Sequence, residues 1–504
     1  MLQMLNNHHH LLVLLVLSCS SFGHLVQVNN AKELIDLFKD ATGNTLETDI
    51  EVTADLDFSS SNLTLPLGAF SNGTCVAYSG VFQGNGHSIK NLVMDNGKSR
   101  VAGLFCSLKD ATVENLVIDT SCLFSGYWAG ALSVSVYGSL IVKHTTSNAA
   151  VDGRDRLGGF IGYVKDLKQK TVISFENCIH HGNVIGVGWS NGGFIGYMPN
   201  NANMNITFLN CTHNGLVTGG NYIGGFVGSL TASSYMKTDF INCTNNGNTS
   251  GLQGIGGFIG YVGNDKNFEI AIFNSSNNGN VNGKGCVGGF AGHFSGNQNA
   301  KMSFSNSINH GTIIGSEGYV GGFVGLIYDN TNVEFVISNS ENNENATGSN
   351  DVGGFVGSSH RNTNLVLNLS GSKNNGNISK SGDVGGFIGF IGYETNTTTT
   401  ISNCINKGNG LGQSSYVGGF IGCLYSESRS SSITVCITNS ANKGHPLAPN
   451  SVACGFVCVD PESNFNVKST IVNSINKGSV NASTNAYGIT NIITVARNVV
   501  SMGD

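Results

Sequence analysis

Val384-Gly385-Gly386-Phe387-Ile388-Gly389 is one of nine near-identical copies of a short glycine-rich phrase in this chain. Each copy centres on a phenylalanine, and a tenth, worn copy reads Ala453-Cys454-Gly455-Phe456. A near-fixed period of this kind predicts a repeat architecture in which each repeat contacts its neighbours along a solenoid. The central phenylalanines are 32 to 36 residues apart, at Phe160, Phe194, Phe226, Phe258, Phe290, Phe323, Phe355, Phe387, Phe420 and Phe456.

The phrase predicts a structural element and not a phosphate-binding loop. A phosphate-binding loop requires a Lys followed by Ser or Thr, which closes none of the copies, and nine copies cannot all be phosphate sites. We expect the ten phenylalanines to stack inside the solenoid as its structural core. The glycines beside them would allow the close backbone approach that a tight corner needs.

Composition restricts the class of protein. The chain has 504 residues, of which 40% are hydrophobic and 11% are charged, and its net charge is −6. Disordered chains are poorer in apolar residues and richer in net charge, so a folded chain is predicted. A weakly acidic chain without a Lys/Arg stripe also argues against nucleic acid as the partner.

Residues 1–23 are predicted to form a secretory signal peptide. The apolar run Leu11–Leu17 is too short to span a bilayer, and mostly small residues follow it from Ser18 to Gly23. Leu17-Ser18-Cys19 leaves a second interpretation open, a bacterial lipoprotein box with a lipidated cysteine. No later segment is long and apolar enough to span a membrane. The chain is therefore expected to be secreted or displayed on the extracellular face of the cell surface, and its twelve Asn-x-Ser/Thr sequons make it a candidate glycoprotein.

Residues 24–48 are predicted to form an N-terminal cap. Ala31–Ala41 places Leu34 and Phe38 at helical spacing, and Asn29 or Asn30 is positioned to cap the helix. A short helix at this place would cover the open end of a solenoid, where the core is otherwise exposed.

The rest of the chain divides into opening coils over residues 49–150 and about ten repeats of ~32 residues over 151–504. Ile50–Phe58 alternates apolar and polar residues and reads as the first strand.

The opening coils resemble a known family. The segments in question are Ala54-Asp55-Leu56-Asp57-Phe58, Leu65-Pro66-Leu67-Gly68, Gly80–Leu92, Gly103-Leu104-Phe105 and Ala111–Leu116. They are similar to the opening coils of secreted right-handed parallel β-helix proteins of the pectin-lyase-like type, above all those with the GLUG repeat. The resemblance extends from Ala54 to the C-terminus and implies an all-β, right-handed, three-faced parallel β-helix on a secreted or surface protein.

One repeat of about 32 residues fits one coil of such a helix. In the example of residues 171–203, Val172–Cys178 reads as a strand, with a turn at His180-His181-Gly182. A second strand over Asn183–Val187 and a third over Gly192–Met198 complete the coil. Stacked coils rise ~4.8 Å each, so about thirteen coils would form a rod roughly 60 Å long.

Polar residues recur at one corner of each repeat. Their stacked side chains are expected to hydrogen-bond along the rod axis and to satisfy a turn's backbone, while glycines two residues later suit positive φ. The polar positions are His180, His213, Asn245, Asn277, Asn309, Asn342, Asn374, Asn406, Asn442 and Asn476. The glycines are Gly182, Gly215, Gly247, Gly279, Gly311, Gly376, Gly408, Gly444 and Gly478.

The cysteines do not predict a metal site. Cys178, Cys211 and Cys243 would stack on neighbouring coils in a poor orientation for disulfides, and Cys454 and Cys458 form a lone CxxxC without the second pair that a zinc site needs. Free packed thiols and occasional disulfides both remain open. No cofactor is predicted.

Asp351 and Asp383 are the candidate catalytic pair. Each lies four residues before its phenylalanine on adjacent coils, so their carboxylates would be neighbours. Such a pair suits acid/base glycoside cleavage or cation binding, and the alternative is two solvated turn residues. The charged cluster Asp152-Gly153-Arg154-Asp155-Arg156 reads as an exposed loop.

A second series of residues lies three positions after the phenylalanines. It comprises Tyr163, Tyr197, Tyr261, His293 and Phe390. Residues on both sides of the strand are then apolar or aromatic. Either the intervening glycine bends both sets inward, or an aromatic stripe lies outside and is a candidate binding face.

Two functions follow as hypotheses. The first is a β-helix interaction protein, adhesin-like or structural and without catalysis, whose partners are glycans or proteins on a host or neighbouring cell. The second is a β-helix enzyme acting on polysaccharide through Asp351 and Asp383. The even spacing of the repeats shows no long active-site loop, which favours the first.

Overall fold

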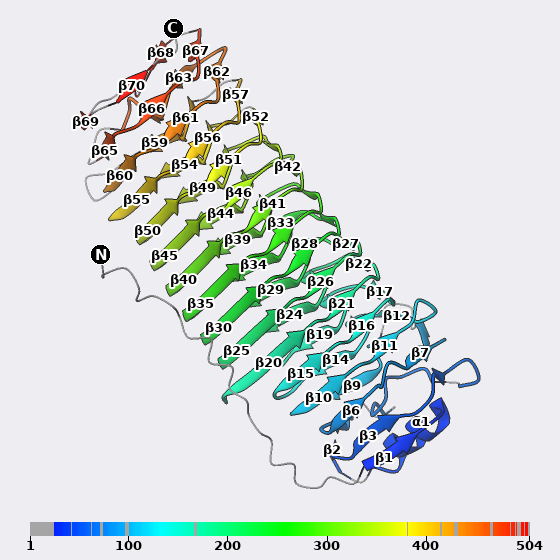
Figure 1. Ribbon diagram of the computed structural model, residues 1–504. Helices are drawn as coiled ribbons and strands as arrows, with labels where there is room; N and C mark the ends of the chain where they lie inside the picture. Colours follow the sequence, from blue (N-terminus) through cyan, green and yellow to red (C-terminus); the bar gives the residue numbers. More distant parts are fainter. Residues whose placement is uncertain are drawn as a thin grey trace, which may run out of the picture.

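The protein is an all-β parallel solenoid of about 13 turns with one short helix (Figure 1). The computed structural model describes residues 25–41, 43–61, 63–70, 74–95, 100–165, 169–380, 382–413, 416–427, 432–463, 467–483, 485–488, 490, 495–497 and 499–501. The predicted signal peptide and the lipoprotein-type Cys19 therefore lie outside the described residues. The strands form five stacked sheets of 16, 15, 13, 12 and 14 strands, here called sheets 1 to 5 in that order.

One coil shows how the five sheets arise. It contains β20 (Thr171–Glu176), β21 (Ile179–His180), β22 (Val184–Gly186), β23 (Asn191–Gly192) and β24 (Ile195–Pro199), which belong to sheets 1 to 5 in turn. Each strand pairs in parallel with its equivalent one coil along.

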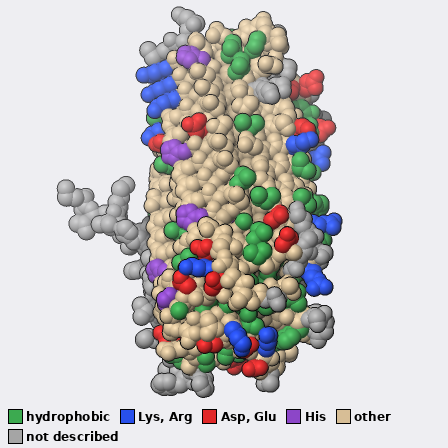
Figure 2. All heavy atoms as spheres, turned by 90° about the vertical axis from the view of Figure 1, so that its right-hand side faces the viewer, with side chains coloured by type: hydrophobic (Ala, Val, Ile, Leu, Met, Phe, Trp, Pro, Cys, Tyr) green, Lys and Arg blue, Asp and Glu red, His purple; other side chains and the backbone are tan. Residues whose placement is uncertain are grey.

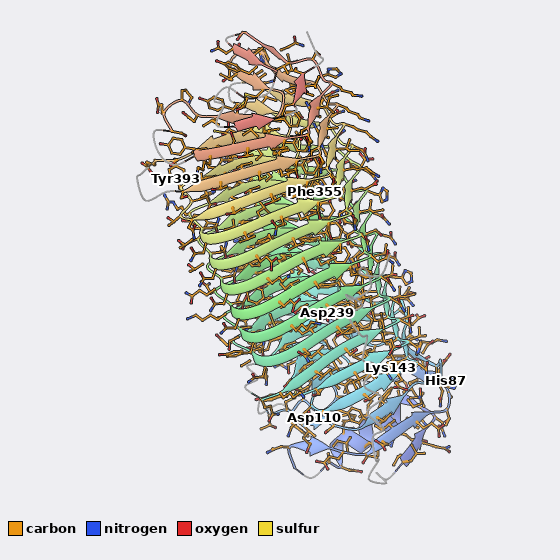
Figure 3. The ribbon with its side chains drawn as sticks, turned by 60° about the vertical axis from the view of Figure 1, so that its left-hand side comes forward. His87, Asp110, Lys143, Asp239, Phe355 and Tyr393 are labelled. Carbon is orange, nitrogen blue, oxygen red and sulfur yellow. A yellow bond between two sulfur atoms is a disulfide. The ribbon has the colours of Figure 1, made fainter. Side chains whose placement is uncertain are left out.

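Sheet 1 carries the longest strands, which lie side by side in Figure 3. In its regular part these are β25 (Ala202–Leu209), β30 (Ser234–Ile241), β35 (Lys266–Phe273), β40 (Gln298–Ser305), β45 (Thr331–Ser338), β50 (Thr363–Ser370), β55 (Thr397–Ser402), β60 (Ile433–Thr438) and β65 (Val467–Val472). The side of the rod formed by sheets 2 and 3 has few charged side chains along its middle (Figure 2).

The expected three strands per coil are present as segments, but two of them are broken by bends. Asn177 adopts φ 53°, which ends β20 and starts β21, so His180 lies in a strand and not in a turn. The segment Gly192–Met198 is likewise interrupted after Gly192, between β23 and β24. Asparagine tolerates the left-handed region, and most later coils repeat this bend with an Asn.

The ten phenylalanines of the repeat are fully buried and stack ring on ring along the axis. Neighbouring ring centroids are 4.7 to 5.3 Å apart from Phe160 to Phe456. A second stack of Phe175, Phe208 and Phe240 from sheet 1 packs edge-on against it, with Phe208 and Phe226 at 75°. The core is therefore continuous along the axis from coil to coil.

The inner asparagines form a hydrogen-bonded ladder, as predicted. Asn245 Nδ2 donates to Asn277 Oδ1 at 2.8 Å and to the Gly247 carbonyl at 2.9 Å, and the same pair of bonds recurs toward Asn476. These side chains are buried, so each amide satisfies the backbone of its own coil and links it to the next.

The prediction of positive φ for the glycines of this corner was wrong. The series from Gly182 to Gly478 has φ outside the left-handed region. Glycine is required there for space, because a Cβ on Gly215 would collide with the Gly182 carbonyl oxygen of the preceding coil. Positive φ occurs instead at the preceding corner, between sheets 1 and 2, at Asn177 and its equivalents.

The predicted N-terminal helix is α1 (Ala31–Lys39), which covers the lower end of the rod in Figure 1. Asn30 is the N-cap, and its Oδ1 accepts a hydrogen bond from the Glu33 N–H at 3.0 Å. Phe38 packs against Tyr78 and Phe105, with centroids 6.1 and 5.8 Å apart, and so closes the core.

The first strand lies earlier than predicted. It is β1 (Leu25–Val28), which pairs with β3 (Asp49–Val52), while β4 (Leu56–Asp57) belongs to another sheet. The segment Ile50–Phe58 is therefore two strands with a corner between them.

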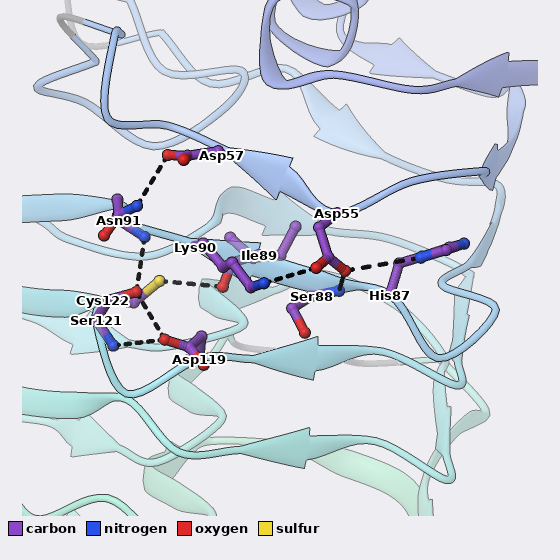
Figure 4. Close-up of polar contacts among 10 residues, drawn as sticks. All are labelled: Asp55, Asp57, His87, Ser88, Ile89, Lys90, Asn91, Asp119, Ser121 and Cys122. Atoms are coloured by element: carbon purple, nitrogen blue, oxygen red, sulfur yellow. Dashed lines mark hydrogen bonds and ion pairs between the residues drawn. The ribbon is translucent and has the colours of Figure 1, made fainter.

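Charged groups join the opening coils on the outside (Figure 4). The Asp55 carboxylate accepts hydrogen bonds from the Ser88 N–H at 2.9 Å and from Lys90 Nζ at 2.6 Å, and these contacts hold the pKa of Asp55 below its usual value. Asn91 donates to Asp57 at 2.9 Å in the same way.

Two disulfides occur within the described residues, Cys75–Cys106 and Cys454–Cys458. Cys178, Cys211 and Cys243 are free, buried and stacked, and each thiol donates to backbone carbonyls. These three cysteines are therefore packing residues.

Candidate binding face and cleft

Sheet 5 carries the aromatic series on its outer face. The strands of sheet 5 that follow the phenylalanines from Phe160 to Phe420 are β19 (Ile161–Val164), β24, β29 (Val227–Thr231), β34 (Ile259–Gly263), β39 (Ala291–Ser295), β44 (Val324–Tyr328), β49 (Val356–His360), β54 (Ile388–Gly392) and β59 (Ile421–Tyr425). Tyr163, Tyr197, Tyr261, His293 and Phe390 share one register position and are half-buried.

Both alternatives for this strand hold in part. Phe160 and Ile161 are both fully buried, because the bend before β19 turns the two neighbours inward. Tyr163, two residues later, points outward and lies in a half-buried stripe. The position is interrupted by the buried side chains of Ser229, Leu326, Ser358 and Cys423.

Rings from the turn before sheet 4 extend the stripe into chains of contacts. Tyr127, Trp128, Tyr163 and Tyr197 follow one another with centroids 5.7, 6.0 and 5.9 Å apart. A second chain runs from Trp189 through Tyr222 and Tyr261 to His293, at 5.8, 4.4 and 5.2 Å. A third joins Tyr319, His360, Phe390, Tyr393 and Tyr425. We call this surface the aromatic face.

The aromatic face contains a cleft of about 620 Å³. Both tryptophans of the chain line it, and Trp189 is 58% exposed. The Ser190 and Ser229 hydroxyl oxygens are 2.8 Å apart at its wall. Other residues that line the cleft are Tyr127, Arg154, Asp155, Arg156, Tyr197 and Tyr222.

A left-handed backbone conformation orients several of these side chains. The residue four places before the phenylalanine has positive φ in four consecutive coils, with Arg156 at 56°, Ser190 at 63°, Tyr222 at 65° and Gly254 at 65°. Left-handed backbone is unusual for bulky residues and clusters at functional sites. Next to this position, the Asp155 carboxylate accepts the Trp189 N–H at 2.8 Å and so fixes the loop that presents the indole.

The sequence suggested that Arg156 lies in an exposed loop, but its side chain is half-buried among aromatic rings. Its Cζ lies 4.7 Å from the centroid of Trp128, 4.8 Å from that of Tyr197 and 5.2 Å from that of Tyr163. Arg154 lies over Tyr127 at 5.2 Å. A guanidinium over an aromatic face is attracted by about 0.5–1 kcal/mol at exposed sites and more when desolvated.

The sequence missed the tryptophans and the two arginines as site residues. They occupy turns that vary from coil to coil, so the repeat does not single them out. A usable signal was present, because the chain has only two tryptophans and Trp189 lies next to the position four before Phe194.

Asp351 and Asp383 occupy that same position and line a second pocket of about 370 Å³ with Tyr319, His360, Phe390 and Tyr393. Burial raises the pKa of Asp351 to about 7, with a further contribution from Asp383, and burial raises the pKa of Asp383 to about 6. The Tyr416 N–H donates to Asp383 at 3.1 Å. Both side chains are half-buried. Because the pKa of Asp351 is the higher of the two, Asp351 is the carboxyl group that holds a proton near neutral pH.

His360 faces the same pocket in its neutral form. Burial lowers the pKa of His360 to about 4, and its Nδ1 is 3.1 Å from the Ser358 hydroxyl. Across the described ranges, no cluster of three or more His, Cys, Asp or Glu side chains is arranged to hold a metal ion. What the pocket offers is two carboxyl groups, an imidazole and aromatic walls.

A larger groove of about 740 Å³ crosses sheet 1. Its charged residues Lys237, Glu269, Lys301 and Glu334 alternate in sign, and Lys301 Nζ already pairs with Glu334 at 3.0 Å. Because these charges neutralise each other, the groove offers less to a ligand than the cleft.

The structure is a parallel β-solenoid whose aromatic face contains the cleft. No family model matches the chain, so its resemblance to GLUG-repeat proteins stays a prediction. A segment of 94 residues is 33% identical to Halomucin of Haloquadratum walsbyi, which amounts to 18% of this chain and 1% of that protein.

Among solved structures, a "putative immunoglobulin A1 protease" from Bacteroides ovatus matches over 70% of this chain and 77% of that chain, with 15% sequence identity and a TM-score of 0.30. So distant a likeness carries no information on activity. In the part of the chain that the structure describes, no helix has the length and apolar character needed to cross a membrane.

Proposed function

We propose that this chain is a secreted or cell-surface β-helix interaction protein that binds glycans on the aromatic face. The observation that carries the proposal is the cleft, where both tryptophans of the chain and three tyrosines meet. Aromatic rings supply flat apolar contact, and their polar ends and neighbouring hydroxyls supply hydrogen bonds. A sugar presents this same combination of an apolar ring face and hydroxyl edges.

The shape of the face suits a linear polymer. Successive coils rise about 4.8 Å, which is comparable with the length of one sugar ring in an extended chain. The rings of Tyr163 and Tyr197 lie one coil apart and in contact, as do those of Trp189 and Tyr222. A glycan lying along the axis would therefore meet a fresh aromatic ring at nearly every coil. The partner is proposed to be a glycan, free or on a glycoprotein, of a host or neighbouring cell.

Three observations support an extracellular location. The apolar run Leu11–Leu17 is typical of a signal peptide. Disulfides such as Cys75–Cys106 persist in oxidising compartments. The partial similarity to Halomucin is a weak hint of a surface protein.

The proposal is tested with the purified chain on a glycan array, followed by titration of the best ligand. Because both tryptophans line the cleft, their fluorescence reports occupancy directly. Trp189→Ala should weaken binding by about tenfold or more, as expected for loss of an aromatic contact at a binding hot spot. Tyr235→Ala is the matched control, since Tyr235 is 63% exposed on sheet 1. Equal loss in both variants, or no glycan binding, would sink the proposal.

A second function, cleavage of polysaccharide, is favoured by one observation. Asp351 and Asp383 line one pocket with pKa values raised to about 7 and 6. In hydrolysis, a protonated Asp351 would give its proton to the glycosidic oxygen as the C–O bond breaks. The Asp383 carboxylate would take a proton from the water that forms the new C–O bond.

This second proposal is tested by assaying new reducing ends on the glycans that bind. Asp351→Asn together with Asp383→Asn should abolish cleavage and leave binding in the distant cleft intact. Cleavage that survives the double substitution would show that this pocket is not the active site. Binding without any turnover would leave the interaction protein as the function.

A further inference from the structure

We infer that Arg156 makes the cleft selective for glycans that carry an anionic group, a carboxylate or a sulfate. This inference rests on the proposed function and adds the chemical class of the ligand. It begins from charge. The chain carries a net charge of −6 and only six arginines, and two of these, Arg154 and Arg156, line this cleft.

The acidic group in the cleft does not neutralise Arg156. Asp155 Oδ1 accepts the Trp189 N–H at 2.8 Å, and Asp155 Oδ2 lies 3.7 Å from Arg154 Nε. Within the described residues, the Arg156 guanidinium has no hydrogen bond or ion pair. Its five N–H donors are therefore available to a ligand.

The rings hold the guanidinium in place for such a ligand. Arg156 Cζ lies within 5.2 Å of the centroids of Trp128, Tyr163 and Tyr197, so the long side chain is already ordered before anything binds. Preorganisation of this kind reduces the entropy lost on binding. Packing over ring faces leaves the in-plane N–H groups free to donate a bidentate pair of hydrogen bonds to a carboxylate or sulfate.

The backbone supports the same assignment. Arg156 has φ 56°, a conformation that a long side chain seldom adopts, and Ser190 repeats it one coil along. The Arg156 N–H donates to the Trp189 carbonyl at 2.8 Å, so the unusual conformation is fixed by the neighbouring coil. Residues kept in sparsely populated conformations cluster at ligand sites, and here the conformation directs the side chain into the cleft.

The test compares three oligosaccharides by tryptophan fluorescence. The probes are a hyaluronan hexasaccharide with carboxylates only, its neutral methyl ester, and a carrageenan hexasaccharide with sulfates only. The unsubstituted protein should bind at least one anionic probe about tenfold more tightly than the ester, as expected for one charge-assisted pair. Added salt should narrow this difference. The two anionic arms identify which oxyanion fits.

Arg156→Gln should remove the preference for the anionic probe while binding of the neutral ester stays within about twofold. Arg156→Lys should restore only part of it, because an ammonium lacks the planar fork. Arg361→Gln is the matched control, because Arg361 lies over Tyr328 outside the cleft, and it should leave the preference unchanged. Near-UV circular dichroism checks that each variant keeps its fold.

The outcomes separate the two proposals. Equal binding of anionic and neutral probes, with Arg156→Gln unchanged, would overturn the anion selectivity and leave glycan binding in place. Binding of an acidic peptide such as oligo-glutamate but of no sugar would overturn both. Loss of all binding in Arg156→Gln, including the neutral ester, would show that Arg156 supports the cleft walls and does not select the ligand.

Discussion

The Nδ1 atoms of His180 and His213 lie 3.2 Å apart on adjacent coils, with their rings stacked and fully buried. At that distance one nitrogen donates a proton and the other accepts it, so the pair is neutral. Burial lowers the pKa of His213 to about 3 and that of His180 well below its usual value. The two histidines occupy the first positions of a ladder that continues with asparagine from Asn245.

This pair predicts a loss of stability in acid. In the unfolded chain each histidine has a pKa near 6.5, above its folded value, so its contribution is complete above about pH 6.5 and is lost as the pH falls. Each unit below that point should reduce the free energy of unfolding by up to about 1.4 kcal/mol per histidine. The measurement is urea denaturation between pH 7 and 4. The double variant His180→Asn with His213→Asn should flatten the dependence, and an unchanged slope would contradict the assignment.

Asp265 predicts the opposite dependence. It lies in a second buried ladder between Ser233 and Asn297, and burial raises its pKa to about 7 from an unfolded value near 3.9. Its contribution is therefore complete below about pH 4 and is lost as the pH rises through about 7.

We expect Asp265→Asn to stabilise the protein by about 1–3 kcal/mol at pH 8 and by much less at pH 5. The amide could donate as Asn297 Nδ2 does to the Val262 carbonyl at 3.3 Å. Denaturation at the two pH values measures the difference. Asp239→Asn on the outside of sheet 1 is the control (Figure 3), and a gain of equal size at both pH values would show that the buried charge is not responsible.

Substitution of Phe258 tests how much one buried phenylalanine contributes to the free energy of unfolding. It stacks on Phe226 at 4.7 Å and on Phe290 at 4.9 Å and is fully buried. Phe258→Ala should reduce the free energy of unfolding by about 3–5 kcal/mol because it leaves a cavity in a continuous stack. Hydrogen exchange should show the lost protection in the adjoining coils first. Phe258→Leu should be much milder, and comparable effects of the two would argue against a cavity.

Asp155 predicts how rigidly the cleft is held. Its carboxylate accepts the backbone N–H of Trp189, so Asp155→Ala should free this loop and weaken glycan binding several-fold. In a Trp128→Phe background, acrylamide quenching of the remaining indole should rise in the absence of ligand. Asp239→Ala should leave both readouts unchanged. Unaltered quenching in Asp155→Ala would show that the bond does not order the loop.

Much of the fold could be predicted from the repeat, because the same core residues recur at nearly equal spacing. The phenylalanine series, the asparagine ladder and the capping of α1 by Asn30 all rest on local patterns. The division into five sheets could not be predicted in this way. It depends on the left-handed conformation of Asn177 and its equivalents, which look in sequence like any polar residue at the end of a strand.

The sites were predictable only in part. Asp351 and Asp383 could be placed on adjacent coils because both lie four residues before a phenylalanine. The shared pocket with His360 and Tyr393 depends on side-chain burial, which spacing does not reveal. The cleft was missed because Arg156 and Trp189 are 33 residues apart in the sequence and come together only where neighbouring coils stack. There the Arg156 N–H donates to the Trp189 carbonyl.

The phenylalanine position has a consequence for how new specificities can arise. Every repeat places its phenylalanine in the stack, while in several coils the side chains four before and three after it reach the surface and are not part of that stack. In one stretch those two places hold Arg156 and Tyr163, and in another Asp383 and Phe390. The surface of such a coil can therefore be changed by two substitutions that leave the buried phenylalanine in place. Binding sites for different ligands can then be engineered on separate coils that share one buried core.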